Sequence, residues 1–451
     1  MRTRVLLLLS VFLLGCLGLS VFSASTATQK QFPSIVYTST PRFLPSAWLT
    51  GGERFPNGAA VMLRGDGESR KLIPSFAASA DPDVSFDGSR ILFAGKKTAT
   101  DAWQIWEIGA DGTALRQITF GTSDAVRPFY LPEDRVVYSR RVDGRFVLES
   151  TSTSGSAASG LFFVPGNAIA TDVLRDGRIL FGSSYPFGGT TPEIYTIYSD
   201  GSGVESYRCD HKTGRFGGRQ VASGDIVFST GRGLARFTSP SAQQVSIVAP
   251  AGDYAGDVTE LSDGSWLLSK RSGNSVPFQL VMWKPGQSNA AAVISDKSNL
   301  VQARIVAGRS VPNRHPSALH PWKTANLLAL NVYTSKYNFP AGSVASVRVY
   351  TQAPDGKESL MGTAPVENDG SLYVKVPGDQ PLKFELVDRQ GKSLKKQAGW
   401  MWARAGEQRV CVGCHAGPEH APENAVPKIL LRSTTPADMT ANGTSTNAGG
   451  N

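Results

Sequence analysis

Short apolar runs recur along the first two thirds of the chain, each directly after a turn rich in Asp, Gly or Ser. The clearest runs are residues 91–93, 136–138, 179–181, 226–228 and 266–268. They are spaced about 40 to 47 residues apart, the range expected for four-stranded propeller blades. Asp-Gly supplies the backbone freedom of a tight turn, and the apolar triplet after it can pack between neighbouring blades.

Second strands follow several of these runs. Residues 103–108 and 193–198 alternate between apolar and polar positions, and each segment precedes an Asp-Gly pair, which predicts a hairpin. Residues 35–37 form a further copy that would contribute to closure. We therefore predict a β-propeller of about six or seven blades over residues 32–310. The alternative is a β-sandwich of unrelated hairpins, which the repeat disfavours.

The pattern changes after residue 310. Residues 311–316 are typical of a linker, and four short strands are expected at 327–333, 344–350, 371–377 and 382–388. We interpret residues 311–405 as a small β-sandwich, which makes the fold class all-β. Residues 433–451 consist mainly of Thr, Ala, Asn, Ser and Gly without a core-forming pattern, and we predict that this tail is disordered.

The N-terminus has the pattern of a signal peptide, which we assign to residues 1–31. A short basic segment, an apolar run over residues 5–22 and small residues at 23–27 follow one another. Residues 13–16 resemble a lipobox, in which Cys16 would be lipidated. Ordinary cleavage near Ser23 or Ala27 and an uncleaved anchor are the alternatives. All three deliver the body of the protein to the periplasm, with membrane attachment only through the N-terminus.

Composition adds two limits. The 451 residues exceed one ordinary core, so more than one domain is expected. The formal net charge is +9, but the basic residues are spread along the chain without a long Lys/Arg run. A nucleic-acid partner is therefore not expected.

The strongest chemical motif lies in the segment 406–432. Cys411, Cys414 and His415 form a Cys-x-x-Cys-His sequence, which is typical of covalent attachment of c-type haem. The two thiols can bond to the two vinyl groups of the macrocycle, and His415 is then placed to bind the iron. The signal peptide agrees with this interpretation, because such haem is attached outside the bacterial cytoplasm.

Two other chemistries fit the cysteines. A redox-active dithiol would need a thioredoxin-like βαβ environment, which the sequence does not predict. A structural zinc site could use Cys411, Cys414, His415 and His420. Separately, Cys209 lies near Asp210 and His211, a group that can bind zinc but that also suits a loop with one buried thiol.

The second axial position of the iron is open in the sequence. The candidate ligands are Glu419 and His420 close to the motif, and Met401, His315, His320 and His211 brought in by folding. A protein ligand there would make the haem six-coordinate and suited to electron transfer. An open position would allow chemistry on a small molecule.

Two resemblances add to these patterns. Residues 82–93 resemble the repeat of propellers related to TolB. The region from about 300 to 430 resembles the middle region of hydrazine synthase alpha subunits. The stretches that carry this resemblance are 314–316, 364–377, 381–388 and 406–415. It implies a haem-bearing β-domain that follows a propeller.

The same resemblance implies an unusual haem environment. In that family a tyrosine soon after the motif binds the iron, and the motif histidine turns toward a zinc site that includes a propeller cysteine. By analogy, Cys209 and His415 would share zinc. This chain has no tyrosine after Cys414, and Glu419 or His420 stands in the corresponding region.

The sequence thus supports three functions. The first is an exported monohaem protein that passes electrons to a partner protein. The second is a haem enzyme that acts on a small nitrogen or oxygen compound. The third is a propeller-based binding module in which the cysteine motif holds a structural metal.

Overall fold

The computed structural model describes residues 33–65, 67–184, 191–208, 214–240, 242–335, 337–353, 355–413 and 424–440. Within these ranges the regular secondary structure is almost entirely β, arranged in eight four-stranded sheets. The helical elements described there are η1 (Ala47–Thr50) and α1 (Lys428–Arg432), and no described helix is long and apolar enough to cross a membrane. The all-β fold class is confirmed. The predicted signal peptide with Cys16 lies outside the described residues.

Six sheets share one topology, in which strands pair antiparallel with their neighbours in the sheet. Five contain consecutive strands. They are β4 (Ala78–Val84), β5 (Arg90–Lys96), β6 (Gln104–Gly109) and β7 (Arg116–Gln117); β8 (Ala125–Leu131), β9 (Arg135–Val142), β10 (Arg145–Ser152) and β11 (Ser159–Gly160); β12 (Ala168–Val173), β13 (Ile179–Ser183), β14 (Glu193–Ile197) and β15 (Glu205–Ser206); β16 (Phe216–Gln220), β17 (Ile226–Ser229), β18 (Leu234–Phe237) and β19 (Val245–Ile247); and β20 (Asp253–Glu260), β21 (Trp266–Arg271), β22 (Gln279–Trp283) and β23 (Ala291–Ile294).

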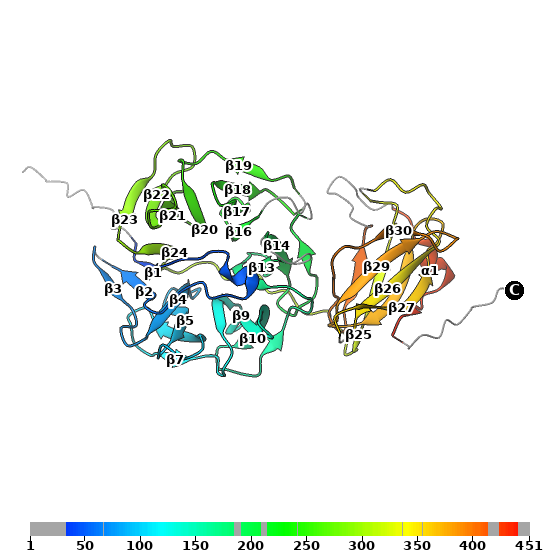
Figure 1. The fold of residues 1–451 in the computed structure, drawn as a ribbon, viewed down its shortest axis with the longest axis horizontal. Coiled ribbons are helices and arrows are strands. Elements are labelled where there is room, and N and C mark those ends of the chain that lie inside the picture. Colours follow the sequence, from blue (N-terminus) through cyan, green and yellow to red (C-terminus); the bar gives the residue numbers. More distant parts are fainter. Residues whose placement is uncertain are drawn as a thin grey trace, which may run out of the picture. The chain divides into compact units, whose positions relative to one another are not determined.

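The sixth sheet joins the two ends of the repeat region. It pairs β24 (Asn299–Ile305) with β1 (Ile35–Thr40), followed by β2 (Ala60–Arg64) and β3 (Ser69–Lys71). The inner strands β4, β8, β12, β16, β20 and β24 contact one another in that order, and β24 returns to contact β4. Figure 1 shows these sheets around a common centre. The closed ring is a β-propeller, as predicted.

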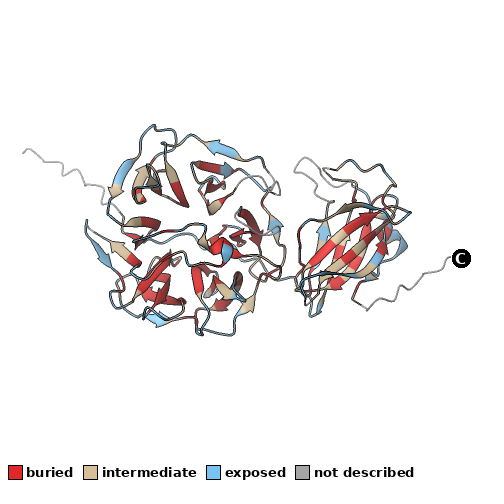
Figure 2. Ribbon diagram, in the orientation of Figure 1, coloured by how far each residue is buried: buried red, intermediate tan, exposed pale blue. Residues whose placement is uncertain are grey.

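The predicted turns and apolar triplets explain how the sheets pack. In the turn before β5, Gly88 has a φ of 77°, and Asp87 accepts hydrogen bonds from the hydroxyls of Ser85 and Ser89. Ile91 and Phe93 pack with Val36 of the preceding sheet, whereas Leu92 belongs to a cluster on the opposite side. Alternate side chains of one strand therefore fill the spaces on both sides of a sheet, and Figure 2 shows these strands as buried.

The inner strands carry a second repeated feature that the sequence analysis missed. Their pairing register is interrupted by a β-bulge, for example between Ala80 and Asp83 in β4 and between Val126 and Phe129 in β8. Asp81 and Arg127 lie in these bulges with left-handed φ values of 58° and 57°. A bulge changes the direction in which a side chain points, and here it places charged groups inside the ring.

These charged groups form one connected network. Arg127 pairs with Asp81 and Asp257, Arg219 pairs with Asp257 and Asp172, and Arg304 pairs with Asp172 and Asp83; Arg54 and Arg309 complete it through Asp81 and Asp83. Three of the guanidiniums, those of Arg127, Arg219 and Arg304, also lie about the ring of Phe129 at 5.0–5.6 Å. The centre of the propeller is thus filled by paired charges around one aromatic ring.

The remaining two sheets form a β-sandwich. One contains β31 (Gln408–Cys411), β25 (Thr324–Ala329), β28 (Leu372–Pro377) and β32 (Ala437–Asp438), and the other contains β27 (Glu358–Pro365), β26 (Ser346–Gln352), β29 (Leu382–Val387) and β30 (Ser393–Lys396). Their inner faces share an apolar core that includes Leu327, Val347, Val374 and Leu386. The predicted alternation of β26 is confirmed, since Val347 and Val349 are buried and Ser346 and Arg348 are not fully buried.

Two details differ from the sequence prediction. The strand expected at 327–333 begins and ends earlier, at Thr324–Ala329, because the chain turns where Val332 donates a hydrogen bond to Gly370. Residues within the predicted disordered tail are also ordered. β32 pairs with β28 at Val374, and Met439 is buried in the sandwich core. The backbone of β28 pairs with β32, and the composition of the tail does not predict this pairing.

Candidate haem-attachment site

Cys411, the first cysteine of the motif, is the last residue of β31. This strand pairs parallel with β25, with Arg409 opposite Leu327 and Cys411 opposite Ala329. Paired residues of neighbouring strands point to the same face of a sheet, so Cys411 shares the face of Ala329, which packs against the sandwich core. Leu330 donates a backbone hydrogen bond of 2.9 Å to the carbonyl of Cys411. The first cysteine of the motif is therefore held by the pairing of β31 with β25.

The thiol of Cys411 is half-buried and forms no disulfide with a described residue. Burial raises its pKa, while Arg409 acts in the opposite direction. The reactive cysteine of a redox dithiol has a lowered pKa because the thiolate is the nucleophile. The direction found here gives no support to the dithiol interpretation, and a thiol on an edge strand with no disulfide partner among the described residues is compatible with attachment of haem.

The turn after β31 packs tightly against another loop of the sandwich. A Cβ atom added to Gly413 would lie 2.1 Å from the carbonyl oxygen of Thr334 and 2.7 Å from that of Asn331. No side chain can occupy this space unless the backbone moves. Gly413, one of the two variable positions of the Cys-x-x-Cys-His motif, is therefore required by the packing of the turn.

Glu407 anchors the strand from its other end. Its side chain is buried, and its carboxylate accepts hydrogen bonds from the backbone N–H of Arg404 at 2.7 Å and from that of Gly203 at 3.1 Å. It also pairs with Arg409 at 2.8 Å. Glu407 thus connects β31 to the turn between β14 and β15 of the propeller.

The residues before Glu407 extend this connection, and the chain from Pro33 onward forms one compact unit. Arg404 donates to the carbonyl of Asp200 at 3.0 Å and pairs with Asp379 at 2.7 Å. Trp402 is buried, and its ring lies edge-on against Phe162 of the propeller at 5.2 Å. The segment that leads to Cys411 is therefore packed against propeller side chains.

The candidate iron ligands within the described residues lie in three different environments. Met401 pairs with Leu382 through the backbone and packs against the sandwich core. His315 stacks on Tyr198 of the propeller at 3.7 Å, and its buried Nδ1 has no hydrogen-bond partner in the described structure. His320 stacks on Trp322, and its Nε2 lies 2.8 Å from Nε2 of Gln408 in β31. His320 is therefore in direct contact with the strand that ends at Cys411.

The remaining predicted site residues lie outside the described part of the chain. They are Cys209, His211, Cys414, His415, Glu419 and His420. Among the described residues, no group of three or more His, Cys, Asp or Glu side chains is positioned to hold a metal ion. The predictions of an axial ligand and of a zinc site therefore stay predictions.

The sequence analysis did not identify Arg404 and Glu407 as residues that position the motif. Gly203, which donates to Glu407, is 204 residues away in the chain. A signal does exist for the charged propeller centre, because a charged residue recurs before each apolar triplet, at Asp83, Arg127, Asp172, Arg219 and Asp257. The apolar triplets do not reveal these charges, because the charged positions lie in the strand that precedes each triplet.

Fold and site together define a β-propeller protein with an appended β-sandwich, in which an edge strand begins a Cys-x-x-Cys-His segment. Residues 332–416 match the family model of the hydrazine synthase alpha subunit middle domain. Hydrazine synthase subunit alpha of Kuenenia stuttgartiensis is 29% identical over 109 residues, which are 24% of this chain and 14% of that protein. The protein is therefore related to the hydrazine synthase alpha subunit, as the sequence resemblance predicted.

The same relation extends to the fold. The structure of Kuenenia stuttgartiensis hydrazine synthase superposes with a TM-score of 0.77 at 18% identity, over 89% of this chain and 71% of that chain. The similarity thus includes both propeller and sandwich. TolB from Acinetobacter baumannii has a TM-score of 0.38 at 14% identity, over 59% of this chain and 66% of that chain. That likeness is too loose to add to what the strand pairing shows.

Proposed function

We propose that this hydrazine synthase-related protein is an exported c-type monohaem protein that transfers electrons to a partner protein. In this proposal Cys411 and Cys414 form the two thioether bonds, and His415 binds the iron. When bound, haem supplies an iron that accepts and releases one electron. Its export through the N-terminal signal, with or without a lipid on Cys16, belongs to the same proposal.

The observation that carries the proposal is the position of Cys411. Its thiol lies at the end of an edge strand and forms no disulfide with a described residue, and the next described residues turn against the loop that contains Thr334. Glu407 and Arg404 hold this strand through hydrogen bonds to the propeller. A fixed attachment point suits electron transfer, because a rigid site limits reorganisation and keeps the distance to a partner constant.

A pyridine haemochrome spectrum of the protein, exported together with a cytochrome c maturation system, tests this proposal. We expect the spectrum of a haem bound through two thioethers, retained after denaturation. Cys411→Ala and Cys414→Ala should each lose one thioether or the haem. Cys209→Ala, which leaves the motif intact, serves as the matched control. Wild-type protein without covalent haem would refute the proposal.

A haem enzyme is the second candidate, and the match of residues 332–416 to the hydrazine synthase middle domain favours it. It requires an iron position open to a small molecule. Carbon monoxide added to the reduced protein distinguishes the two functions. An unchanged low-spin spectrum supports electron transfer, whereas a shifted Soret band supports an enzyme acting on a small nitrogen or oxygen compound.

Zinc belongs to this second candidate. We infer from the family resemblance that Cys209 and His415 would share the ion, with His211 as a further ligand. Zinc analysis of the purified protein and of Cys209→Ala tests the inference. Zinc in the wild type and its loss in the variant, with haem retained, would support it. Equal zinc content in both proteins would exclude Cys209 as a ligand.

A further inference from the structure

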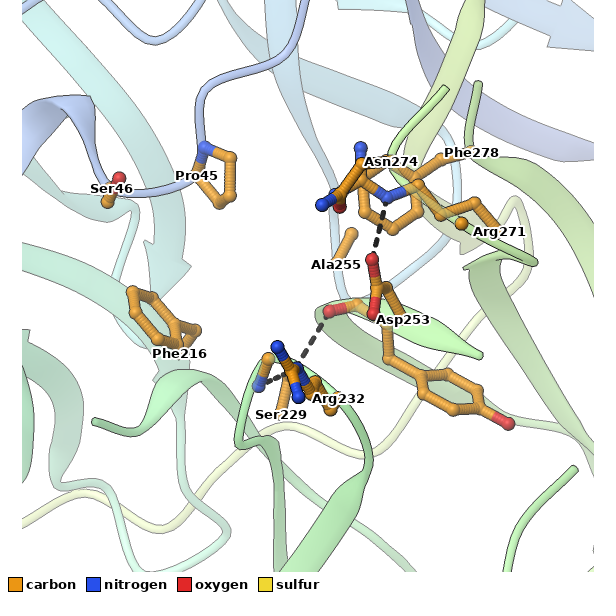
Figure 3. A pocket seen from close by; sticks show the side chains of 13 residues that line it. Pro45, Ser46, Phe216, Ser229, Arg232, Asp253, Ala255, Arg271, Asn274 and Phe278 are labelled. Atoms are coloured by element: carbon orange, nitrogen blue, oxygen red, sulfur yellow. Dashed lines mark hydrogen bonds and ion pairs between the residues drawn. The ribbon is translucent and has the colours of Figure 1, made fainter. Parts of the chain in front are cut away.

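A cavity of about 370 Å³ opens in the propeller between the inner strands β16 and β20 and the segment before η1. The turn between β17 and β18 supplies Arg232, and the turn between β21 and β22 supplies Asn274 and Phe278. Pro45 closes one side (Figure 3). This volume lies within the range of small-molecule sites.

The cavity lies on the propeller face opposite to the turn that binds Glu407. In an antiparallel four-stranded sheet, the turn between the second and third strands is at the other end from the turn between the third and fourth. Arg232 and Asn274 come from turns of the first kind, whereas Gly203, which binds Glu407, comes from a turn of the second kind. The cavity is thus separate from the proposed haem function and does not depend on it.

The charges that line the cavity leave one positive charge in excess. Arg271 pairs with Asp253 at 3.1 Å, donates to Asn274 at 2.7 Å and lies over the ring of Phe278 at 4.5 Å. Its guanidinium is therefore fixed. Arg232 is exposed at the cavity and has no ion-pair partner within the described part of the chain. Two guanidiniums and one carboxylate give a net charge of +1.

Aromatic side chains supply the apolar part of the lining. Phe278 is buried and Phe216 is half-buried, and in Figure 3 their rings lie on different sides of the open space, with Arg232 at its lower edge. A guanidinium fork matches a carboxylate in two hydrogen bonds. A ligand that satisfies both features has a flat apolar body and one negative charge.

We propose that this cavity is a binding site for small aromatic carboxylates. Arg232 would bind the carboxylate, the Arg271–Asp253 pair would fix the rim, and the ligand's ring would lie against Phe216 and Phe278. Neutral ligands of the same shape would leave Arg232 without a partner. Cationic ligands would be repelled by the excess positive charge.

Isothermal titration calorimetry of the whole chain, as purified, with three probes of one shape tests the proposal. We expect benzoate to bind and benzamide to bind about tenfold more weakly, because the neutral amide loses the charge-assisted hydrogen bond to Arg232. Benzamidine, which is cationic, should not bind. Benzoate affinity should also fall as NaCl is raised. Equal affinity for benzoate and benzamide, or no benzoate binding at millimolar concentration, would overturn the proposal.

Two variants locate the site. Arg232→Gln should lower benzoate affinity about tenfold, whereas Arg389→Gln removes the same charge from an exposed position of the sandwich and should change nothing. Gly273→Trp adds a large side chain at the cavity wall, where a Cβ would meet no atom within 4 Å, and should abolish binding without disturbing the fold. Benzoate binding that survives in Gly273→Trp would place the ligand elsewhere.

Discussion

The propeller and the sandwich are both built from four-stranded sheets, yet their centres differ in kind. The sandwich encloses aliphatic side chains such as Leu327 and Val374. The propeller centre encloses ionisable side chains, with Arg127 4% and Asp81 2% exposed. Two flat sheets meet over broad apolar faces. Six inner strands converge at their backbones, and the narrow space they leave is filled by side chains that the bulges turn inward.

The two centres should also differ in how much stability is lost when one side chain is removed. An apolar core loses stability roughly in proportion to the atoms removed and the cavity left. In a buried charge network, removal of one member leaves its counter-charges with fewer partners in a medium of low dielectric constant. The propeller centre should therefore be the more sensitive of the two, although it contributes less through hydrophobic burial.

The largest expected effect is that of Arg127→Met. This change keeps an unbranched side chain but leaves Asp81 and Asp257 without their shared partner. We expect a loss of about 4 kcal/mol in the free energy of unfolding, measured by urea denaturation with a probe in the propeller. The double variant Arg127→Met/Asp257→Asn should recover part of the loss. No recovery would show that the pairing of these charges is not what Arg127 contributes.

Leu327→Ala is the matched change in the sandwich. Leu327 is 5% exposed in β25, and truncation should cost about 3 kcal/mol through lost contacts and the remaining cavity. Urea denaturation again provides the measurement. Leu328→Ala, at the next position of β25 on the outer face, is the control and should cost clearly less. Similar losses for both would contradict the inward direction that the pairing with β28 gives to Leu327.

The two centres should also differ in how their contributions to folding stability depend on pH. Burial alone would raise the pKa of Asp257, but Arg127 and Arg219 attract its ionised form, so that the pKa is lowered overall. A carboxyl with a lowered pKa stabilises the fold above its unfolded pKa of about 3.9, and this contribution disappears as the pH falls through the folded value.

Asp257→Asn should therefore destabilise the protein at pH 7, and the difference from wild type should shrink as the pH is lowered from about 5 toward 2. Thermal unfolding at several pH values measures it. The loss caused by Leu327→Ala should stay constant over the same range, because no titrating group is removed. A constant deficit for Asp257→Asn would mean that the carboxyl is not ionised in the folded protein.

The sequence revealed the propeller through one strand in each sheet. The apolar triplets stand out because both of their faces are buried, which makes each strand continuously hydrophobic. The inner strands carry Asp81, Arg127 and Arg219 where a buried strand is expected to be apolar. Their charges become understandable only when strands about one repeat apart meet around the centre, and no local pattern predicts that contact.

For the candidate site, the cysteine motif could be predicted from the sequence, but the contacts that position it could not. Spacing alone identified Cys411, since two thiols and a histidine at fixed intervals are rare by chance. The packing of Gly413 on Thr334 and the bond from Gly203 to Glu407 depend on tertiary structure. Gly203 and Glu407 are 204 residues apart, so no local sequence pattern shows that they are in contact.

The smallest expected effect concerns a carboxylate at the surface of the sandwich that pairs with two lysines. Glu358 pairs with Lys383 and Lys396 and is about a third exposed. Its hydrogen bonds to the two lysines lower its pKa, but solvent screens the attraction. Glu358→Gln should cost only about 0.5 kcal/mol at low salt, measured by urea denaturation, and less at 1 M NaCl. The deficit of Arg127→Met should change little with salt, because buried charges are poorly screened. If salt reduced both deficits equally, water and ions would reach the propeller centre, and the contrast between a sealed charged core and a solvated surface pair would be lost.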